Sequence, residues 1–168
     1  MHNQSDTEFA QVIEQNKHRI YRLCSIYAVS PLEPQDLFQE VIIQVWKSLP
    51  GFEGKSSVNT WIYRIALNVC YRSKQKINTK DRATVRLDSI HFEIAESVPD
   101  IGQLEKLQAL RECMSSLNDR DKSIVTLHLE DLPHKEIAAI TGLTENHIAV
   151  KLKRIRKVLL ACITQRIR

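Results

Sequence analysis

Glycine is scarce in this sequence, which has four glycines and five prolines among 168 residues. Runs that alternate apolar and polar residues, as β-strands do, are missing too. Apolar residues recur instead at three- and four-residue intervals, the spacing of one face of a helix. These features argue against a sheet-rich fold and predict an all-α protein. A chain of this length can hold two small helical domains, each with a modest core.

Long apolar runs are also absent. No run of about 18 apolar residues occurs, so we expect no membrane span, and the N-terminal stretch MHNQSDTEFAQ lacks the apolar core of a signal peptide. The four cysteines form no CxxC pair and no Cys/His cluster, which argues against zinc. Each lies in an apolar helical pattern, so we predict four buried thiols in a protein of the reducing cytoplasm. These residues are Cys24, Cys70, Cys113 and Cys162.

Catalytic and cofactor signatures are equally lacking. The six histidines, at positions 2, 18, 91, 128, 134 and 147, form no visible base–nucleophile or metal-binding constellation. We therefore expect a protein that is not an enzyme and that needs no metal or cofactor.

The modest net charge of +4 is unevenly distributed. Residues 1–76 carry +2, residues 77–103 carry −2 and residues 104–168 carry +4. From Lys151 to Arg168 there are seven basic residues and no acidic one, so the C-terminal region is the better candidate for binding a polyanion.

Helical periodicity divides the chain into two domains. Three helices are predicted in residues 1–77: the first over residues 7–29, the second from Pro34 to Pro50, and the third capped by Ser57 and ending near Lys76. Residues 78–101 lose the period and carry acidic charge, which predicts a flexible linker with at most a marginal helix at 89–96. Residues 102–168 regain the helical pattern and form the second domain, in which Asn118 is expected to cap a helix.

The stretch from His134 to Leu160 predicts a helix-turn-helix. Gly142 stands where a left-handed turn residue is needed, Ala138 is small enough for a close helix crossing, and Thr144 can cap the second helix. Four residues at helical spacing form the apolar face of that helix: Ile148, Leu152, Ile155 and Leu159. Its other face is basic, as a helix lying in the major groove requires, with Lys151, Lys153, Arg154, Arg156 and Lys157. Helical hairpins with solvated basic faces also occur in proteins that do not bind DNA, so this motif alone leaves both interpretations open.

Two further stretches resemble a known family. DLFQEVIIQVW at residues 36–46 and FEGKSSVNTWIYRIALN at residues 52–68 closely resemble the second conserved region of bacterial RNA polymerase sigma factors. With the hairpin, the whole chain resembles the extracytoplasmic function group, in which a region-two domain of three helices is linked to a region-four domain of four helices. This resemblance implies an alternative sigma factor that binds core RNA polymerase, recognises promoter DNA and helps to open it.

The resemblance also implies site residues. The polymerase-binding residues would be Asp36, Gln39, Glu40 and Gln44, although a solvated polar face fits their spacing equally well. The residues that bind the minus-ten element would be Gly54, Lys55, Ser56, Ser57, Asn59, Asn68, Arg72, Lys74 and Lys76. Trp61 falls on the apolar side of its helix, which favours a core position over base stacking.

For the minus-35 element, the resemblance implies binding by the second helix of the hairpin. The residues are Thr144, Glu145, Asn146, His147, Val150, Lys151, Lys153, Arg154 and Lys157. Relatives often have a glycine, a threonine and a lysine where this chain has Asn146, His147 and Ala149, so the base preference of this helix is open. In the region-two stretch, many relatives have an aromatic at the position of Val58 and an acidic residue near Arg72, and this chain has neither. His147 and Asn146 can contact base edges, although an exposed histidine is usually only a surface residue.

Other expectations come from the family as well. An anti-sigma factor is an expected partner. The acidic linker agrees in sign with a path through the basic RNA channel of the polymerase, although its composition alone favours a solvated spacer. The competing hypothesis is a sequence-specific helix-turn-helix regulator that binds duplex DNA and does not engage polymerase. That hypothesis leaves residues 36–76 unexplained.

Overall fold

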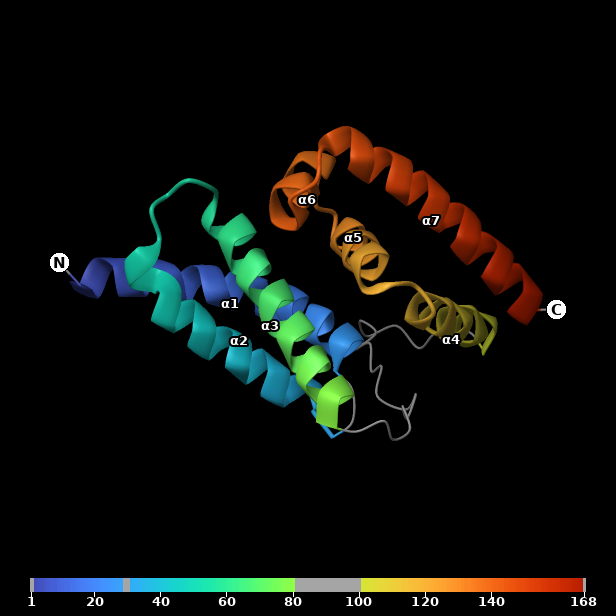
Figure 1. Cartoon of the computed structure of the whole chain (residues 1–168), viewed down its shortest axis with the longest axis horizontal. Helices are drawn as coiled ribbons and strands as arrows, with labels where there is room; N and C mark the ends of the chain where they lie inside the picture. The colour runs from blue at the N-terminus through green and yellow to red at the C-terminus, as the bar shows by residue number, and fades with distance from the viewer. Residues whose placement is uncertain (1, 29–30, 81–100, 168) are drawn as a thin grey trace. The chain divides into compact units, whose positions relative to one another are not determined.

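The computed structural model describes residues 2–28, 31–80 and 101–167, which are helical apart from short turns and loops. They form seven α-helices and one short 3₁₀ helix, and no strand occurs in these ranges. The all-α prediction is confirmed. The chain divides into two compact units, which we call the N-terminal unit (helices α1–α3) and the C-terminal unit (helices α4–α7) (Figure 1).

The N-terminal unit is a three-helix bundle of α1 (His2–Tyr27), α2 (Pro34–Ser48) and α3 (Val58–Lys80). Figure 1 shows α2 running back along α1, and each pair of helices in the unit is in contact. Pro34 starts α2 because its missing N–H is unbonded at a helix N-terminus anyway. The helices bury their apolar stripes against one another, and the core contains Ile20, Leu23, Leu37, Val41, Val45, Ile62 and Ala66.

The boundaries of these helices differ modestly from the prediction. Helix α1 begins at His2 instead of residue 7, and α3 continues to Lys80 instead of ending near Lys76. Polar residues at helix ends carry no apolar periodicity, so the pattern underestimates both lengths. Ser57 caps α3 as predicted, since its Oγ accepts a hydrogen bond of 3.1 Å from the Thr60 backbone N–H.

The C-terminal unit consists of α4 (Ile101–Ser115), α5 (Asp119–Leu129), α6 (His134–Thr141) and α7 (Glu145–Arg166). Helix α7 contacts the other three helices of the unit. Asn118 caps α5 as predicted, accepting a 2.9 Å hydrogen bond from the Asp121 N–H. The Asp121 carboxylate accepts a 2.9 Å bond from the Asn118 side-chain amide in return, which holds the capping side chain in place.

The predicted helix-turn-helix is confirmed. Gly142 has φ of 74°, the left-handed conformation that ends α6, and the Thr144 Oγ1 accepts a hydrogen bond from the His147 N–H at 3.2 Å to cap α7. Ala138 is buried, as a close crossing requires, and the predicted apolar face of α7 lies in the core. This face contains Ile148, Leu152, Ile155 and Leu159.

The prediction of four buried thiols is wrong for two of the cysteines. Cys113 on α4 and Cys162 on α7 form a disulfide, whereas Cys24 and Cys70 are free and fully buried. The bonded pair is 49 residues apart, and only the packing of α4 against α7 brings it together, so its spacing in the sequence carries no signal. The predicted linker at 78–101 and its marginal helix at 89–96 lie mostly outside the described residues.

Candidate nucleic-acid interface

The first candidate surface is the outward face of helix α7. Its core contacts occupy one stripe, and the opposite stripe presents exposed side chains along the first four turns. The structure brings together most of the predicted minus-35 residues on this stripe, all of them exposed: Asn146, His147, Val150, Lys153, Arg154 and Lys157. Three cations beside two hydrogen-bonding side chains and an apolar residue suit a helix that contacts both phosphates and base edges.

Three predicted residues of this helix have other surroundings. Thr144 caps the helix with its hydroxyl, and Glu145 is exposed in the first turn, where a carboxylate is favourable for the helix dipole. Lys151 is half-buried and its Nζ lies 2.7 Å from Asp121 Oδ1 on α5. Since Lys151 points to a neighbouring helix and its charge is paired, the prediction that it belongs to the exposed basic face is wrong.

Arg156 lies beside the same surface but toward α5. Its guanidinium Nη2 is 2.9 Å from His128 Nε2, and the ring of His128 is 5.9 Å from that of His134. Burial and then the positive charges of Arg156 and His134 lower the pKa of His128, while Asp131 opposes them. A neutral His128 accepts the bond from Arg156. The sequence indicated the exposed arginine but not its histidine partner, because three separate helices contribute to the cluster.

The second candidate surface is the loop before α3. Gly54 has φ of 67°, Lys55 and Glu53 form an exposed ion pair, and Ser56 is half-buried. Two other predicted residues are also structural. Ser57 caps α3, and Asn59 Oδ1 accepts a 3.0 Å bond from the buried Asn16 amide of α1.

Phe52 and Trp61 anchor this loop on the bundle. Their ring centroids are 4.9 Å apart, and Phe9 of α1 lies 6.3 Å from the Trp61 ring. Trp61 is half-buried, so the prediction of a core position is confirmed only in part. It lies opposite the buried stripe of α3, where Phe52 of the returning loop and Phe9 of α1 partly cover it. A half-exposed indole next to small polar residues leaves an aromatic surface beside the loop.

The exposed side of α3 extends this second surface. Asn68, Arg72 and Lys76 follow one another at four-residue spacing and are exposed, so they form one stripe. Arg64 is exposed one turn before Asn68 and belongs to the same stripe. Lys74 is half-buried and lies on a different side of the helix, so the structure does not bring it together with the others.

The third candidate surface is the outward face of α2. Asp36, Gln39 and Glu40 are exposed there, and Gln44 is half-buried with its amide donating a 2.8 Å bond to Glu40 Oε1. Two apolar side chains lie on the same face, Ile43 at 46% exposure and Trp46 at 52%. The apolar periodicity of this helix assigns Trp46 to its covered side and misses its exposure, and it does not include Ile43. Together these residues form a surface of mixed chemistry, as protein interfaces commonly have.

Within the described residues, no group of three or more histidine, cysteine or acidic side chains is arranged to hold a metal ion. In the same part of the chain, no helix combines the length and apolarity needed to cross a membrane.

Comparison with known proteins shows related sequences for both units. The family model for sigma-70 region 2 matches residues 12–79, and the model for sigma-70 region 4 matches residues 107–159. The chain is 27% identical over 161 residues to the ECF RNA polymerase sigma-E factor of Escherichia coli K12, covering 90% of this chain and 84% of the relative. It is 36% identical over 63 residues to the ECF RNA polymerase sigma factor SigG of Mycobacterium tuberculosis, which covers 38% of this chain and 17% of the relative.

Two solved structures share the fold. The sigma factor RpoE of Bartonella quintana, solved in complex with the anti-sigma factor NepR, has a TM-score of 0.75 at 18% identity, covering 94% of this chain and 97% of that one. CnrH, solved in complex with the cytosolic domain of CnrY, has a TM-score of 0.69 at 16% identity, and the match covers 95% of this chain and 90% of CnrH. With both conserved regions matched in order along one chain, this protein belongs to the sigma-70 family of RNA polymerase sigma factors, in the extracytoplasmic function group.

Proposed function

We propose that this chain is an alternative sigma factor that binds core RNA polymerase, recognises a two-part promoter and helps to open it. The observation that carries the proposal is the presence, in one chain, of a region-two unit with a mixed polar and apolar face on α2 and a region-four unit with a basic recognition helix. The proposed domains are residues 1–77 and 102–168, joined by a linker at 78–101.

The proposed polymerase-binding surface is the outward face of α2. Asp36, Gln39, Glu40 and Gln44 would accept or donate hydrogen bonds to a partner helix that carries arginines. Ile43 and Trp46 supply exposed apolar area in the middle of the same face, and aromatic residues commonly anchor protein interfaces. Their exposure supports a docking face over a merely solvated one.

The proposed minus-ten surface is the loop of residues 52–57 with the exposed stripe of α3. Small polar residues beside the half-exposed Trp61 suit the capture of an unstacked base, and the stripe with Asn68, Arg72 and Lys76 suits the single strand that follows. Lys74 should contribute less to binding of the single strand, because its side chain lies outside this stripe. The loop residues are Gly54, Lys55, Ser56 and Ser57, with Asn59 in the first turn of α3.

The proposed minus-35 surface is the outward stripe of α7, where Asn146 and His147 face base edges and Lys153, Arg154 and Lys157 contact phosphates. Lys151 contributes less than its neighbours because it is paired with Asp121. Thr144 acts through the cap that fixes the start of the recognition helix.

We propose an anti-sigma factor as a further partner, since the RpoE relative of known structure is bound to one. A protein that serves RNA polymerase works where the polymerase works, so its compartment would be the cytoplasm. Its role there is binding and positioning, and no catalytic step is assigned to its side chains.

In vitro transcription with purified core enzyme tests the proposal. The template carries a promoter mapped from transcript starts after overproduction of this chain. The expected result is a start that depends on both the core enzyme and this protein. A variant with Ile43 changed to serine should retain its fold, because this side chain is 46% exposed, but should weaken core binding in a native gel. A wild-type chain that binds duplex promoter but never core enzyme would favour the helix-turn-helix regulator instead.

A further inference from the structure

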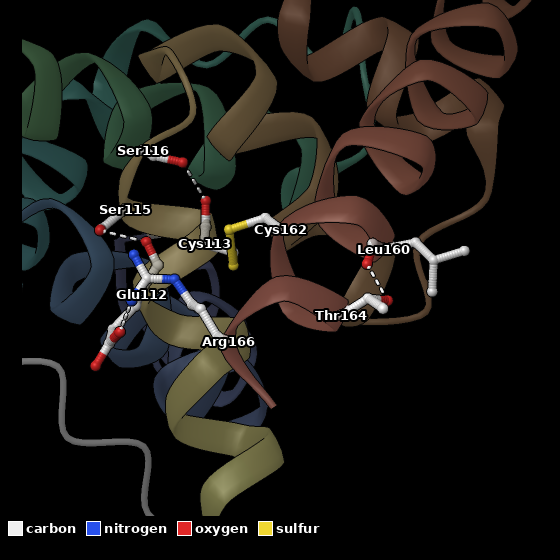
Figure 2. The surroundings of a disulfide bond; sticks show 8 residues. All are labelled: Glu112, Cys113, Ser115, Ser116, Leu160, Cys162, Thr164 and Arg166. Carbon is white, nitrogen blue, oxygen red and sulfur yellow. Dashed lines mark hydrogen bonds and ion pairs between the residues drawn. A yellow bond between two sulfur atoms is a disulfide. The ribbon is translucent and has the colours of Figure 1, made fainter. Parts of the chain in front are cut away.

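Helices α4 and α7 of the C-terminal unit are joined by a covalent bond as well as by packing. The Cα atoms of Cys113 and Cys162 are 6.0 Å apart in their disulfide. Figure 2 shows the bond between the two helices, with Arg166 of α7 directed at Glu112 of α4 beside it and Leu160 pointing away from it. Cys113 is 1% exposed, whereas Cys162 is only half-buried. A small thiol or disulfide can therefore approach the bond from the Cys162 side.

Little else holds the two helices together at this end. Helix α4 buries only Ala109, Cys113 and Met114, a small apolar area for a helix of 15 residues. The last buried core residue of α7 is Leu159, one turn before the disulfide. The Arg166–Glu112 ion pair is partly exposed, and exposed pairs contribute little stability. Opening the disulfide would thus loosen α4 and the end of α7, while Ile148 and Leu152 still hold the recognition turns.

The other two cysteines provide a contrast within the same chain. Cys24 on α1 and Cys70 on α3 are both 0% exposed. A hydrogen bond with Cys24, together with burial, raises the pKa of the Cys70 thiol well above its usual range. Because the thiolate is the reactive form and must be reached by its reagent, this pair is protected from exchange.

We propose that Cys113 and Cys162 form a reversible thiol–disulfide site that sets how firmly α4 is held against α7. The proposal rests on the proposed function, because that function places the chain in the polymerase's compartment. Low-molecular-weight thiols keep that compartment reducing, and disulfides formed there are usually transient or redox-sensing. The redox state of these two cysteines would then control the stability of the α4–α7 contact, which promoter binding itself does not require.

The closing reaction consumes an oxidised low-molecular-weight thiol, such as oxidised glutathione. The Cys162 thiolate attacks one sulfur of that disulfide and releases one reduced thiol, which leaves a mixed disulfide on Cys162. The Cys113 thiolate then attacks the Cys162 sulfur and releases the second reduced thiol. The two cysteines lose two electrons and the small disulfide gains them, and the two cysteine protons end on the released thiols. Opening is the reverse sequence.

The test equilibrates the full chain at a series of ratios of reduced to oxidised glutathione. Free thiols are then alkylated and counted by peptide mass spectrometry, and backbone hydrogen exchange is followed helix by helix. Cys113 and Cys162 should pass together from disulfide to thiols as the reduced fraction rises, while Cys24 and Cys70 remain thiols throughout as internal controls. In the open form, exchange in α4 and the last turns of α7 should be about tenfold faster or more, with α1–α3 unchanged.

The variant Cys162→Ser cannot form the disulfide and is therefore permanently open. Because Cys162 is only half-buried, this substitution should disturb the core less than Cys113→Ser. It should exchange like the reduced wild type even in oxidising buffer. A disulfide that stays closed at every ratio, or an opening that leaves exchange in α4 unchanged, would overturn the proposal. Minus-35 duplex binding is measured on the same samples. A chain that binds no promoter in either state contradicts the proposed function, while the glutathione series still decides the redox site.

Discussion

The two units of this chain combine structure and candidate function in different ways. In the N-terminal unit, two proposed DNA-binding residues also hold the fold: Ser57 caps α3 and Asn59 bonds to the buried Asn16. In the C-terminal unit, the residues proposed to contact DNA project from one stripe of α7, and the core uses the opposite stripe. The loop that would open promoter DNA is therefore coupled to stability, whereas the recognition stripe is free to vary.

This difference has a physical basis. A base pocket needs a loop held in one conformation, so its side chains must bond to the bundle behind it. A recognition helix gets its rigidity from the helix backbone and from apolar residues on its far side, so its outward residues are left for DNA. We expect substitutions on the outward stripe of α7 to change promoter preference at little cost in stability.

The largest expected effect separates the cores of the two units. Ile148 and Ile62 are each fully buried, one in each unit. Ile148→Ala should reduce the free energy of unfolding of the C-terminal unit by about 2–5 kcal/mol and abolish minus-35 binding, and Ile62→Ala should affect the N-terminal unit equally. Hydrogen exchange resolved by helix measures the loss of stability in each unit. Equal acceleration in both units by either substitution would show that they do not fold as separate units.

A smaller effect is expected at the two left-handed glycines, one in each unit. Gly142→Ala and Gly54→Ala should each cost about 1–2 kcal/mol, because a Cβ is strained at positive φ although nothing lies within 4 Å of it. Gly51 also has open space around its Cβ position but no positive φ, so Gly51→Ala is the matched control. The denaturant midpoints of the three variants measure these changes in stability. A cost at Gly51 like that at Gly142 would contradict the backbone explanation.

The double role of the proposed minus-ten surface predicts a cost of about 1 kcal/mol for Asn59→Ala in the first turn of α3, since the substitution removes the hydrogen bond from Asn16. Asn146→Ala on the recognition helix should leave stability unchanged, because that side chain is exposed. Thermal unfolding of the two variants compares the units directly. If Asn146→Ala proved the more destabilising, the contrast between loop and helix would be lost.

Phosphate contacts are expected to give a smaller effect still. Lys153→Ala or Arg154→Ala should reduce the salt slope of minus-35 binding by about one unit and weaken binding several-fold. Lys151→Ala is the matched control, because its charge is already paired with Asp121 and should alter the slope less. Binding isotherms at several salt concentrations measure all three. An equal slope change at Lys151 would place that residue on the DNA surface after all.

The smallest effect concerns pH. The folded pKa of His128 is lowered, so below its usual value of about 6.5 the unfolded chain binds more protons than the folded one. Stability of the C-terminal unit should therefore fall as the pH drops through that value toward the folded pKa. His128→Gln keeps a hydrogen-bond partner for Arg156 but does not titrate, so it should flatten this dependence. An unchanged pH profile in the variant would exclude His128 as its cause.

Local chemistry made much of the fold predictable from the sequence. Asn118, Gly142 and Thr144 form the caps and the turn that their side chains favour, and apolar spacing identified the core stripe of α7. Contacts between distant helices could not be predicted in this way. The Cys113–Cys162 bond, the Lys151–Asp121 pair and the His128–Arg156 bond each join helices through tertiary packing, which periodicity does not encode.

Family resemblance supplied the candidate site residues, and the structure sorts them by surface. Arg64, Ile43 and Trp46 were not predicted as site residues. Arg64 nevertheless lies on the exposed stripe of α3, and Ile43 and Trp46 lie on the outward face of α2. Trp46 of α2 was assigned to the apolar face because helical spacing alone cannot tell which side of a broad apolar stripe is covered.

The most direct test of the account is promoter opening by core polymerase with Asn68→Ala or Arg154→Ala chains, followed by permanganate reactivity of unpaired thymines. Both side chains are exposed, so both variants should fold. We expect Arg154→Ala to open the minus-ten element normally once its concentration is saturating, whereas Asn68→Ala should bind the minus-35 duplex fully yet open less DNA at any concentration. Equal recovery of opening in both variants at saturation would contradict the division of work between the two units.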